Sequence, residues 1–203
     1  MNNKLKSHWE KVYEKESGEF SWNQKIPSLS LEFINSFNLS KSSSIIDIGG
    51  GDSKLVNCLI EDGYENITVL DISNKALEKT KKRIGIKAGK VKWIVSDILN
   101  FESNIQYDLW HDRATFHFLT KPEDVSKYIE TAIQSTKKFL TIGTFSENGP
   151  DKCSGLEVKQ YSEEQIKDAL AKGFKKIRCV KEDHITPFKV HQNFLFCSFK
   201  RLH

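Results

Sequence analysis

The segment Ser44–Ser53 constrains the fold more than any other part of this chain. It reads Ser-Ile-Ile-Asp-Ile-Gly-Gly-Gly-Asp-Ser, a short apolar run that contains an acid and leads into three glycines. A run of this length predicts a buried strand, and the glycines before Asp52 and Ser53 predict a tight turn into a capped helix. Glycines at such a turn let the backbone approach a ligand closely, so we expect a cofactor to bind here.

Apolar periodicity along the rest of the chain predicts alternating strands and helices, typical of an α/β fold with a parallel sheet. The expected strands are 44–48, 67–71, 91–95, 106–111, 138–144, 174–182 and 193–200. The expected helices are 4–15, 28–38, 52–62, 74–84, one that starts at Pro122, and one with a Ser162–Gln165 capping box that stops at Gly173. The last two strands are too close for a crossover helix, so they should pair antiparallel as a hairpin.

Composition limits the class of protein. The 203 residues suit a single domain, and 38% hydrophobic with 29% charged residues is typical of a globular chain. A net charge of +4 is no argument for nucleic acid, and the run 79–83 is interpreted as a solvated helix face. Because no signal peptide or membrane span is found, we expect a cytoplasmic protein with its four cysteines as free thiols and no metal site.

Three acids, Asp47, Asp71 and Asp97, lie at or next to the ends of three successive predicted strands. Because ligands of open α/β sheets bind at the carboxyl ends of the strands, these acids should meet around one nucleoside-bearing cofactor. Asp71 would accept from ribose hydroxyls, with Ile72 packed on the adenine. Asp97 would accept from the adenine amino group, with Ile98 beside it. Either acid alone is as easily explained as a helix N-cap, but the three together favour a cofactor site.

The glycine turn decides between cofactors. A dinucleotide fingerprint requires Gly-x-Gly-x-x-Gly, and here Gly49 and Gly51 fit while Lys54 takes the third glycine position. Asp47, just before Gly49 and Gly50, would repel a pyrophosphate. A cationic cofactor without phosphates, S-adenosylmethionine, suits this turn better.

With these motifs in order and spacing, the sequence resembles the class I S-adenosylmethionine-dependent methyltransferases along essentially its whole length. The resemblance implies a Rossmann-like, seven-stranded sheet in the order 3-2-1-4-5-7-6, and in-line methyl transfer that leaves S-adenosylhomocysteine. It divides the single domain 1–203 into an N-terminal helical lid, 1–40, whose two helices cover the cofactor, and a core, 41–203.

The stretch 107–119 should face both the cofactor and the methyl acceptor. His111, Arg113 and His117 are candidate catalytic residues for substrate positioning or proton acceptance, and His111 also borders the cofactor. An ion pair between Asp112 and Arg113 is an equally good explanation for that pair. The turn-rich stretch 143–156 should form another active-site element, in which Cys153 is interpreted as a packed thiol.

The class of acceptor stays open. Trp22, in a loop before Pro27, is the candidate aromatic lid over the sulfonium, whereas Trp9 is better explained as a structural residue. Some thiol methyltransferases have a similar lid, which favours a small-molecule acceptor such as a thiol. The run Asp112–Thr115 is similar to a motif of elongation-factor lysine methyltransferases, although Ala114 and His117 depart from it. A protein-lysine substrate is therefore the alternative, nucleic acid is less favoured, and a non-catalytic nucleotide-binding module is the alternative class.

Overall fold

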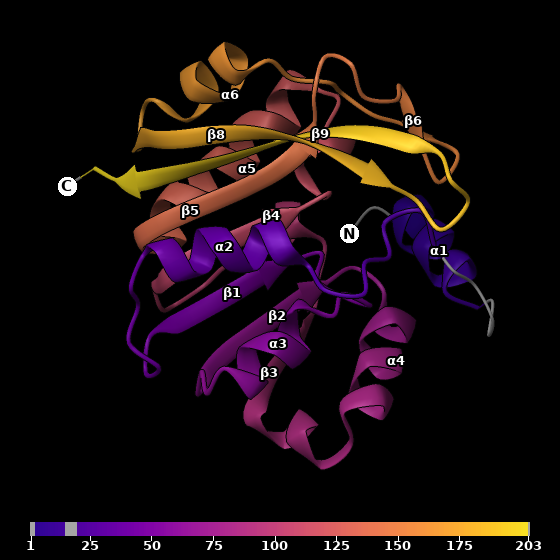
Figure 1. Ribbon diagram of the computed structural model, residues 1–203, viewed down its shortest axis with the longest axis vertical. Coiled ribbons are helices and arrows are strands. Elements are labelled where there is room, and N and C mark those ends of the chain that lie inside the picture. Colours follow the sequence, from indigo (N-terminus) through magenta and orange to yellow (C-terminus); the bar gives the residue numbers. More distant parts are fainter. Residues whose placement is uncertain (1–2, 15–19, 203) are drawn as a thin grey trace.

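The computed structural model describes residues 3–14 and 20–202, which are built around one seven-stranded sheet (Figure 1). The strand order is β3-β2-β1-β4-β5-β9-β8, with a separate two-stranded hairpin of β6 and β7. The strands are β1 Ser44–Ile48, β2 Asn66–Asp71, β3 Val91–Val95, β4 Tyr107–Arg113, β5 Thr136–Phe145, β6 Lys152–Cys153, β7 Leu156–Glu157, β8 Phe174–Ile185 and β9 His191–Arg201. Since β8 and β9 are the sixth and seventh strands of the sheet, the predicted order and the antiparallel tail are confirmed.

Helices cover both faces of the sheet. They are α1 Asn3–Val12, α2 Ser28–Ser36, α3 Leu55–Glu61, α4 Asn74–Ile84, α5 Pro122–Ser135 and α6 Glu163–Leu170. Alternation along β1 sends Ile45 to a core shared with α2, α3 and α4, and Ile46 to a core shared with α5 and α6. The predicted capping box of α6 is confirmed, because Ser162 and Gln165 each accept from the other's backbone N–H.

Two helices differ from their predicted positions for identifiable reasons. α3 begins at Leu55 rather than at residue 52, because the Asp52 carboxylate pairs with Arg83 instead of capping the helix. Residues before α2, but none of Ser28–Ser36, line the cavity at the carboxyl ends of the strands. α2 itself packs on the sheet, where Phe37 stacks on Phe139 of β5, so the expectation that both N-terminal helices cover the cofactor is wrong for α2.

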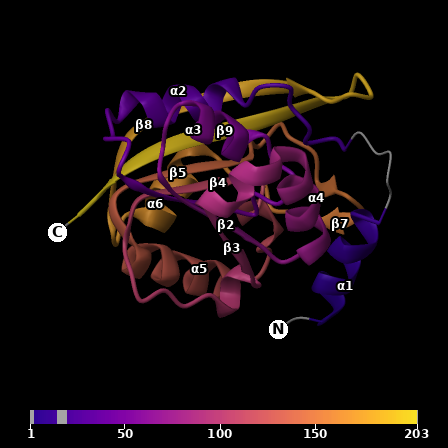
Figure 2. The ribbon, with the colours of Figure 1, turned by 90° about the horizontal axis from the view of Figure 1, so that it is seen from below.

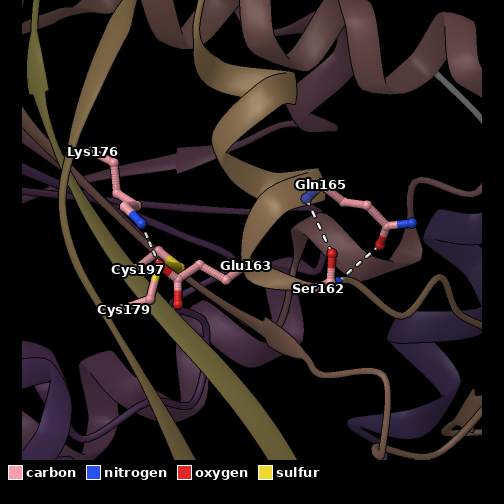
Figure 3. Close-up of a disulfide and its surroundings, with 6 residues drawn as sticks. All are labelled: Ser162, Glu163, Gln165, Lys176, Cys179 and Cys197. Atoms are coloured by element: carbon pink, nitrogen blue, oxygen red, sulfur yellow. Dashed lines mark hydrogen bonds and ion pairs between the residues drawn. A yellow bond between two sulfur atoms is a disulfide. The ribbon is translucent and has the colours of Figure 1, made fainter.

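The expectation of four free thiols is also wrong. Cys179 and Cys197 form a disulfide between β8 and β9, whereas Cys58 and Cys153 are free (Figure 3). The two cysteines are directly opposite in the antiparallel register, with their Cα atoms 4.1 Å apart. Their separation of 18 in sequence concealed this pairing, because the register of two strands decides which side chains meet.

α1 is anchored to the start of α4, beside the carboxyl ends of the parallel strands (Figures 1 and 2). The Glu10 carboxylate accepts from the backbone N–H groups of Asn74 and Lys75, at 2.8 and 3.2 Å, and from the Ser73 hydroxyl at 3.1 Å. These N–H groups belong to the first turn of a helix, where the dipole and the free donors favour a negative charge. Glu10 therefore holds α1 in place over this edge of the sheet.

Replacing Glu10 by alanine should release α1. We expect the loss of this capping carboxylate to lower the free energy of unfolding by about 1 kcal/mol. Amide exchange in residues 3–12 should become faster, as measured by hydrogen–deuterium exchange. Glu14→Ala is the matched control, because Glu14 contacts α4 only through an exposed ion pair with Lys75. Equal exchange in the wild type and Glu10→Ala would contradict this role.

In the described part of the chain, no helix is both long and apolar enough to cross a membrane.

Candidate functional site

A cavity of about 1040 Å³ lies at the carboxyl ends of β1, β2, β3 and β4. The ends of these strands form one wall. The other walls come from α1, the segment 22–27, the β6–β7 hairpin and the residues around the β8–β9 turn. The volume suits a nucleoside cofactor together with a second small molecule. The turn-rich stretch between β5 and α6 therefore borders the cavity, as its composition indicates.

The glycine turn is packed so tightly that side chains do not fit. Gly49 has φ +66°, and a Cβ there would lie 1.9 Å from the Thr115 hydroxyl oxygen. A Cβ on Gly50 would lie 2.2 Å from a carboxylate oxygen of Asp47. Both glycines line the cavity, whereas Gly51 does not. Gly51 instead donates its N–H to Asp71 at 2.9 Å, so this glycine positions the acid rather than lining the cavity.

The structure brings the three predicted acids to the same cavity. Asp71 is buried, and its two oxygens accept from the N–H groups of Gly51 and Ser73. A carboxylate accepts about four hydrogen bonds, so Asp71 keeps acceptor sites for a ligand. Burial raises its pKa to about 6, against the opposing effect of these backbone donors. Asp97 accepts from the N–H of Leu99, and Ile72 and Ile98 line the cavity beside the two acids.

Asp47 and His111 form a buried polar chain with Ser30, which sequence reasoning missed. His111 Nδ1 lies 2.7 Å from an Asp47 oxygen, and Nε2 lies 3.0 Å from the Ser30 hydroxyl. In the neutral ring, Nδ1 donates to the carboxylate and Nε2 accepts from Ser30. The second Asp47 oxygen is buried without a hydrogen-bond partner, while Asp47 and His111 both line the cavity. The cavity therefore holds an unpaired acceptor that suits a cation.

Asp112 and Arg113 point in opposite directions, so the ion pair suggested by their adjacency does not form. Asp112 is fully buried, where it accepts from the Tyr128 hydroxyl at 2.6 Å and from the Thr115 N–H at 3.0 Å. Burial raises its pKa to about 6. Arg113 lines the cavity and donates to the Trp22 carbonyl at 3.0 Å. Because side chains alternate along β4, Asp112 points into the protein core and Arg113 points to the cavity.

The structure does not bring His117 to the cavity lining. Its ring is fully buried and stacks on Phe145, with centroids 4.3 Å apart, and neither nitrogen has a hydrogen-bond partner. Burial, with a smaller effect from the Arg113 charge, lowers the pKa of His117 to about 3. The predicted role in proton acceptance therefore has no geometric support, because the 3₁₀ turn Phe116–Phe118 sends this side chain into an aromatic cluster.

His117 should make stability depend on pH. The unfolded chain binds a proton at this histidine below pH 6.5, and the folded protein does so only near pH 3, so stability is lost as pH falls below 6.5. Between pH 7 and pH 5, the free energy of unfolding of the wild type should fall by about 2 kcal/mol more than that of His117→Phe. Urea unfolding at the two pH values measures this difference. The exposed His191, changed to Gln, is the control. The same pH dependence in both variants would contradict the assignment.

Aromatic side chains roof the cavity. Trp9 and Trp22 both line it and meet edge to face at 5.9 Å, and Phe20 stacks on Trp22 at 4.7 Å. Trp9, interpreted from the sequence as a structural residue, and Trp22, the candidate lid, both pack against a small cluster of Tyr13, Phe20 and Ala76. His184 of β8 bonds to the Ser21 carbonyl and links the β8–β9 turn to this roof.

Arg83 was hidden in a basic run that looks like a solvated helix face. Its guanidinium pairs with Asp52 and donates to the Ser53 carbonyl at 2.7 Å, and its side chain lines the cavity. The sequence feature that could have indicated this role is the position of Arg83 in the last turn of α4, because that turn lies next to Asp52 and Ser53, just after the glycines. Across residues 3–14 and 20–202, no three His, Cys, Asp or Glu side chains gather to hold a metal.

Comparisons with known proteins agree with this geometry. Residues 45–138 match a family described as a methyltransferase domain. EEF1A lysine methyltransferase 2 of Danio rerio is 23% identical over 190 residues, covering 85% of this chain and 76% of the relative. Malonyl-(acyl-carrier protein) O-methyltransferase of Anoxybacillus flavithermus is 35% identical over 128 residues, covering 59% of this chain and 48% of the relative.

The solved structures add the fold. The 1,6-didemethyltoxoflavin-N1-methyltransferase of Burkholderia thailandensis, solved with 1,6-didemethyltoxoflavin and S-adenosylhomocysteine bound, aligns with a TM-score of 0.75 at 15% identity. The alignment covers 98% of this chain and 88% of that one. Together, these findings support a class I S-adenosylmethionine-dependent methyltransferase.

The cavity of this methyltransferase fits the family's cofactor. S-adenosylmethionine is a cation with hydroxyl donors on its ribose, and the cavity offers the unpaired oxygen of Asp47 and the spare acceptor sites of Asp71. The two glycines that lack room for a Cβ give it a backbone surface. Asp97 and Ile98 stand at the next strand end, where the sequence analysis expects the adenine.

Proposed function

We propose that this methyltransferase acts on a small-molecule acceptor, with a soft nucleophile such as a thiol as the first candidate. The observation that carries the proposal is the cavity itself. Trp9 and Trp22 roof it, the β6–β7 hairpin closes one side, and α1 is held over it by Glu10. Such a covered, aromatic space suits a molecule that enters whole, because closure excludes water from the reacting atoms.

The cofactor, when bound, supplies a methyl group attached to a sulfonium sulfur. The acceptor's electron pair forms the new bond to the methyl carbon, the carbon–sulfur bond breaks, and the sulfur remains in a neutral thioether. The protein's part is to align the acceptor and exclude water. Because His111 is bonded at both nitrogens and His117 does not line the cavity, neither histidine presents a free nitrogen to the acceptor. A thiol ionises close to neutral pH and needs less help from a base than an amine or an alcohol, which supports the thiol candidate.

A labelling experiment tests the proposal. The purified protein is incubated with methyl-labelled S-adenosylmethionine and a cell extract that contains both proteins and metabolites. We expect label in the small-molecule fraction, with thioether products when a panel of simple thiols is supplied. Label confined to a protein band would refute the small-molecule assignment. Asp71→Asn, which changes an acid of the cofactor side, is the control for background transfer.

A protein-lysine acceptor is the second candidate, and one conformation favours it. Ala114 has φ +69°, a left-handed conformation that favours glycine, and glycine is the residue at this place in the motif that Asp112–Thr115 resembles. The turn thus keeps the shape of that motif without its glycine. The relative EEF1A lysine methyltransferase 2 points the same way. A labelled protein band whose label maps to lysine by mass spectrometry would favour this candidate.

A further inference from the structure

Among the described residues, Arg113 is the arginine with buried N–H donors that have no hydrogen-bond partner. Arg83 and Arg178 pair with carboxylates, and Arg201 donates to backbone carbonyls. Arg113 has one hydrogen bond, from Nη1 to the Trp22 carbonyl, while Nε and Nη2 are buried without a partner. Unsatisfied buried donors are costly, so a side chain of this kind is expected to find an acceptor when a ligand binds.

The nearest compensating groups do not reach it. Glu182 of β8 and Asp47 both favour the charge of Arg113, but no ion pair of 4.0 Å or less joins either of them to it among the described residues. The Glu182 carboxylate also has a buried oxygen without a hydrogen-bond partner. The guanidinium carbon Cζ lies over the Phe194 ring, 5.2 Å from its centroid. Arg113 is thus held between the Phe194 ring and the Trp22 carbonyl, while its Nε and Nη2 donors remain available to an acceptor.

Its position separates it from Asp71 and Asp97, although Asp47 lies on β1, the strand next to β4. Asp71 ends β2 and Asp97 follows β3, at one end of the sheet order. Arg113 ends β4. Phe145 of β5 and Phe194 of β9, toward the other end of the sheet order, line the same cavity, as does Cys153 of the separate β6–β7 hairpin. A molecule that contacts Arg113 therefore lies beside, rather than within, the space next to Asp71 and Asp97.

We propose that Arg113 anchors an anionic group, such as a carboxylate, on the methyl acceptor. This rests on the proposed function and names its substrate class: a small acceptor that carries an anion within a side chain's reach of its nucleophile. A carboxylate accepts two parallel N–H bonds from a guanidinium, which would satisfy both donors that the protein leaves unpaired. The cofactor's own carboxylate is the competing source of the same chemistry, and the test separates the two.

The test uses benzoate and the neutral benzamide as probes on the S-adenosylhomocysteine complex, by isothermal titration calorimetry. We expect benzoate to bind at least about tenfold more tightly than benzamide. Arg113→Gln should abolish this preference, and Arg113→Lys should keep part of it. Arg178→Gln, in which the lost arginine also lies over a phenylalanine ring but is paired with Glu32, should leave it unchanged. Glu182→Gln, which removes a competing carboxylate, should strengthen benzoate binding without altering Arg113.

Each outcome is decisive. Equal binding of the two probes, or a benzoate preference that survives in Arg113→Gln, overturns the proposal. A loss of S-adenosylhomocysteine affinity in Arg113→Gln, with the benzoate preference intact, assigns the guanidinium to the cofactor and also overturns it. If the wild type does not bind S-adenosylhomocysteine, the proposed function fails. The same probes on the free protein then decide whether Arg113 still selects anions.

Discussion

Replacing Gly49 by alanine should weaken the binding of S-adenosylhomocysteine by about 100-fold or more, which corresponds to about 2.7 kcal/mol. A left-handed backbone at a residue with a Cβ costs about 1–2 kcal/mol. The new methyl group would also lie 1.9 Å from the Thr115 hydroxyl oxygen, which bonds to the Ile48 carbonyl at 3.2 Å. The turn must therefore shift, and its backbone faces the cavity.

Two further variants make the Gly49 experiment specific. Gly89→Ala is the matched control, since a Cβ at Gly89 meets nothing within 4 Å and its φ is not positive. Thr115→Ala in the Gly49→Ala background removes the clashing hydroxyl but not the backbone strain, so it should restore part of the affinity. Calorimetric titration measures all three. Wild-type affinity in Gly49→Ala would show that the turn does not contact the cofactor.

The affinity for S-adenosylhomocysteine should also fall about tenfold between pH 7 and pH 5, because one ionised carboxylate must be present for binding. That carboxylate is Asp71, whose pKa burial raises to about 6. We propose that the ionised form accepts from the ribose hydroxyls while it keeps its hydrogen bonds from the N–H groups of Gly51 and Ser73. Below pH 6, protonation removes acceptor sites and negative charge, so affinity declines as pH falls.

The Asp71→Asn variant isolates this effect. It should bind S-adenosylhomocysteine about 10–100-fold more weakly at pH 7, since hydrogen bonds to a charged group contribute about 1.5–3 kcal/mol. Its affinity should then be flat between pH 7 and pH 5. A pH dependence that persists in Asp71→Asn would assign the titration to another group in the cavity.

Local pattern was sufficient to predict the fold and the edge of the sheet that carries the cavity. The acids Asp47, Asp71 and Asp97 could be located because parallel strands bring their carboxyl ends to one edge, whatever the packing details. The glycine turn could be interpreted because missing side chains leave a direct mark in the sequence. Each of these inferences needed only the strand order and short-range spacing.

What remained hidden depends on contacts between distant elements. Ser30 meets His111 only because α2 packs on the sheet, and no spacing encodes that contact. The Cys179–Cys197 disulfide depends on strand register. His117 follows His111 by six residues and looks equivalent in sequence, but a 3₁₀ turn rotates it into the aromatic cluster. Physical proximity in these cases is a property of tertiary packing.

The alternation of β4 has a consequence for how such an enzyme diverges. The Asp112 side chain accepts from the Tyr128 hydroxyl and from the Thr115 N–H, in the turn beside Gly49. Among the described residues, the side chain of its neighbour Arg113 has one hydrogen bond, to the Trp22 carbonyl. Selection for folding therefore acts mainly on Asp112, and selection for the acceptor acts mainly on Arg113. A lineage can replace the guanidinium, and with it the chemistry it admits, while it inherits the cofactor turn intact.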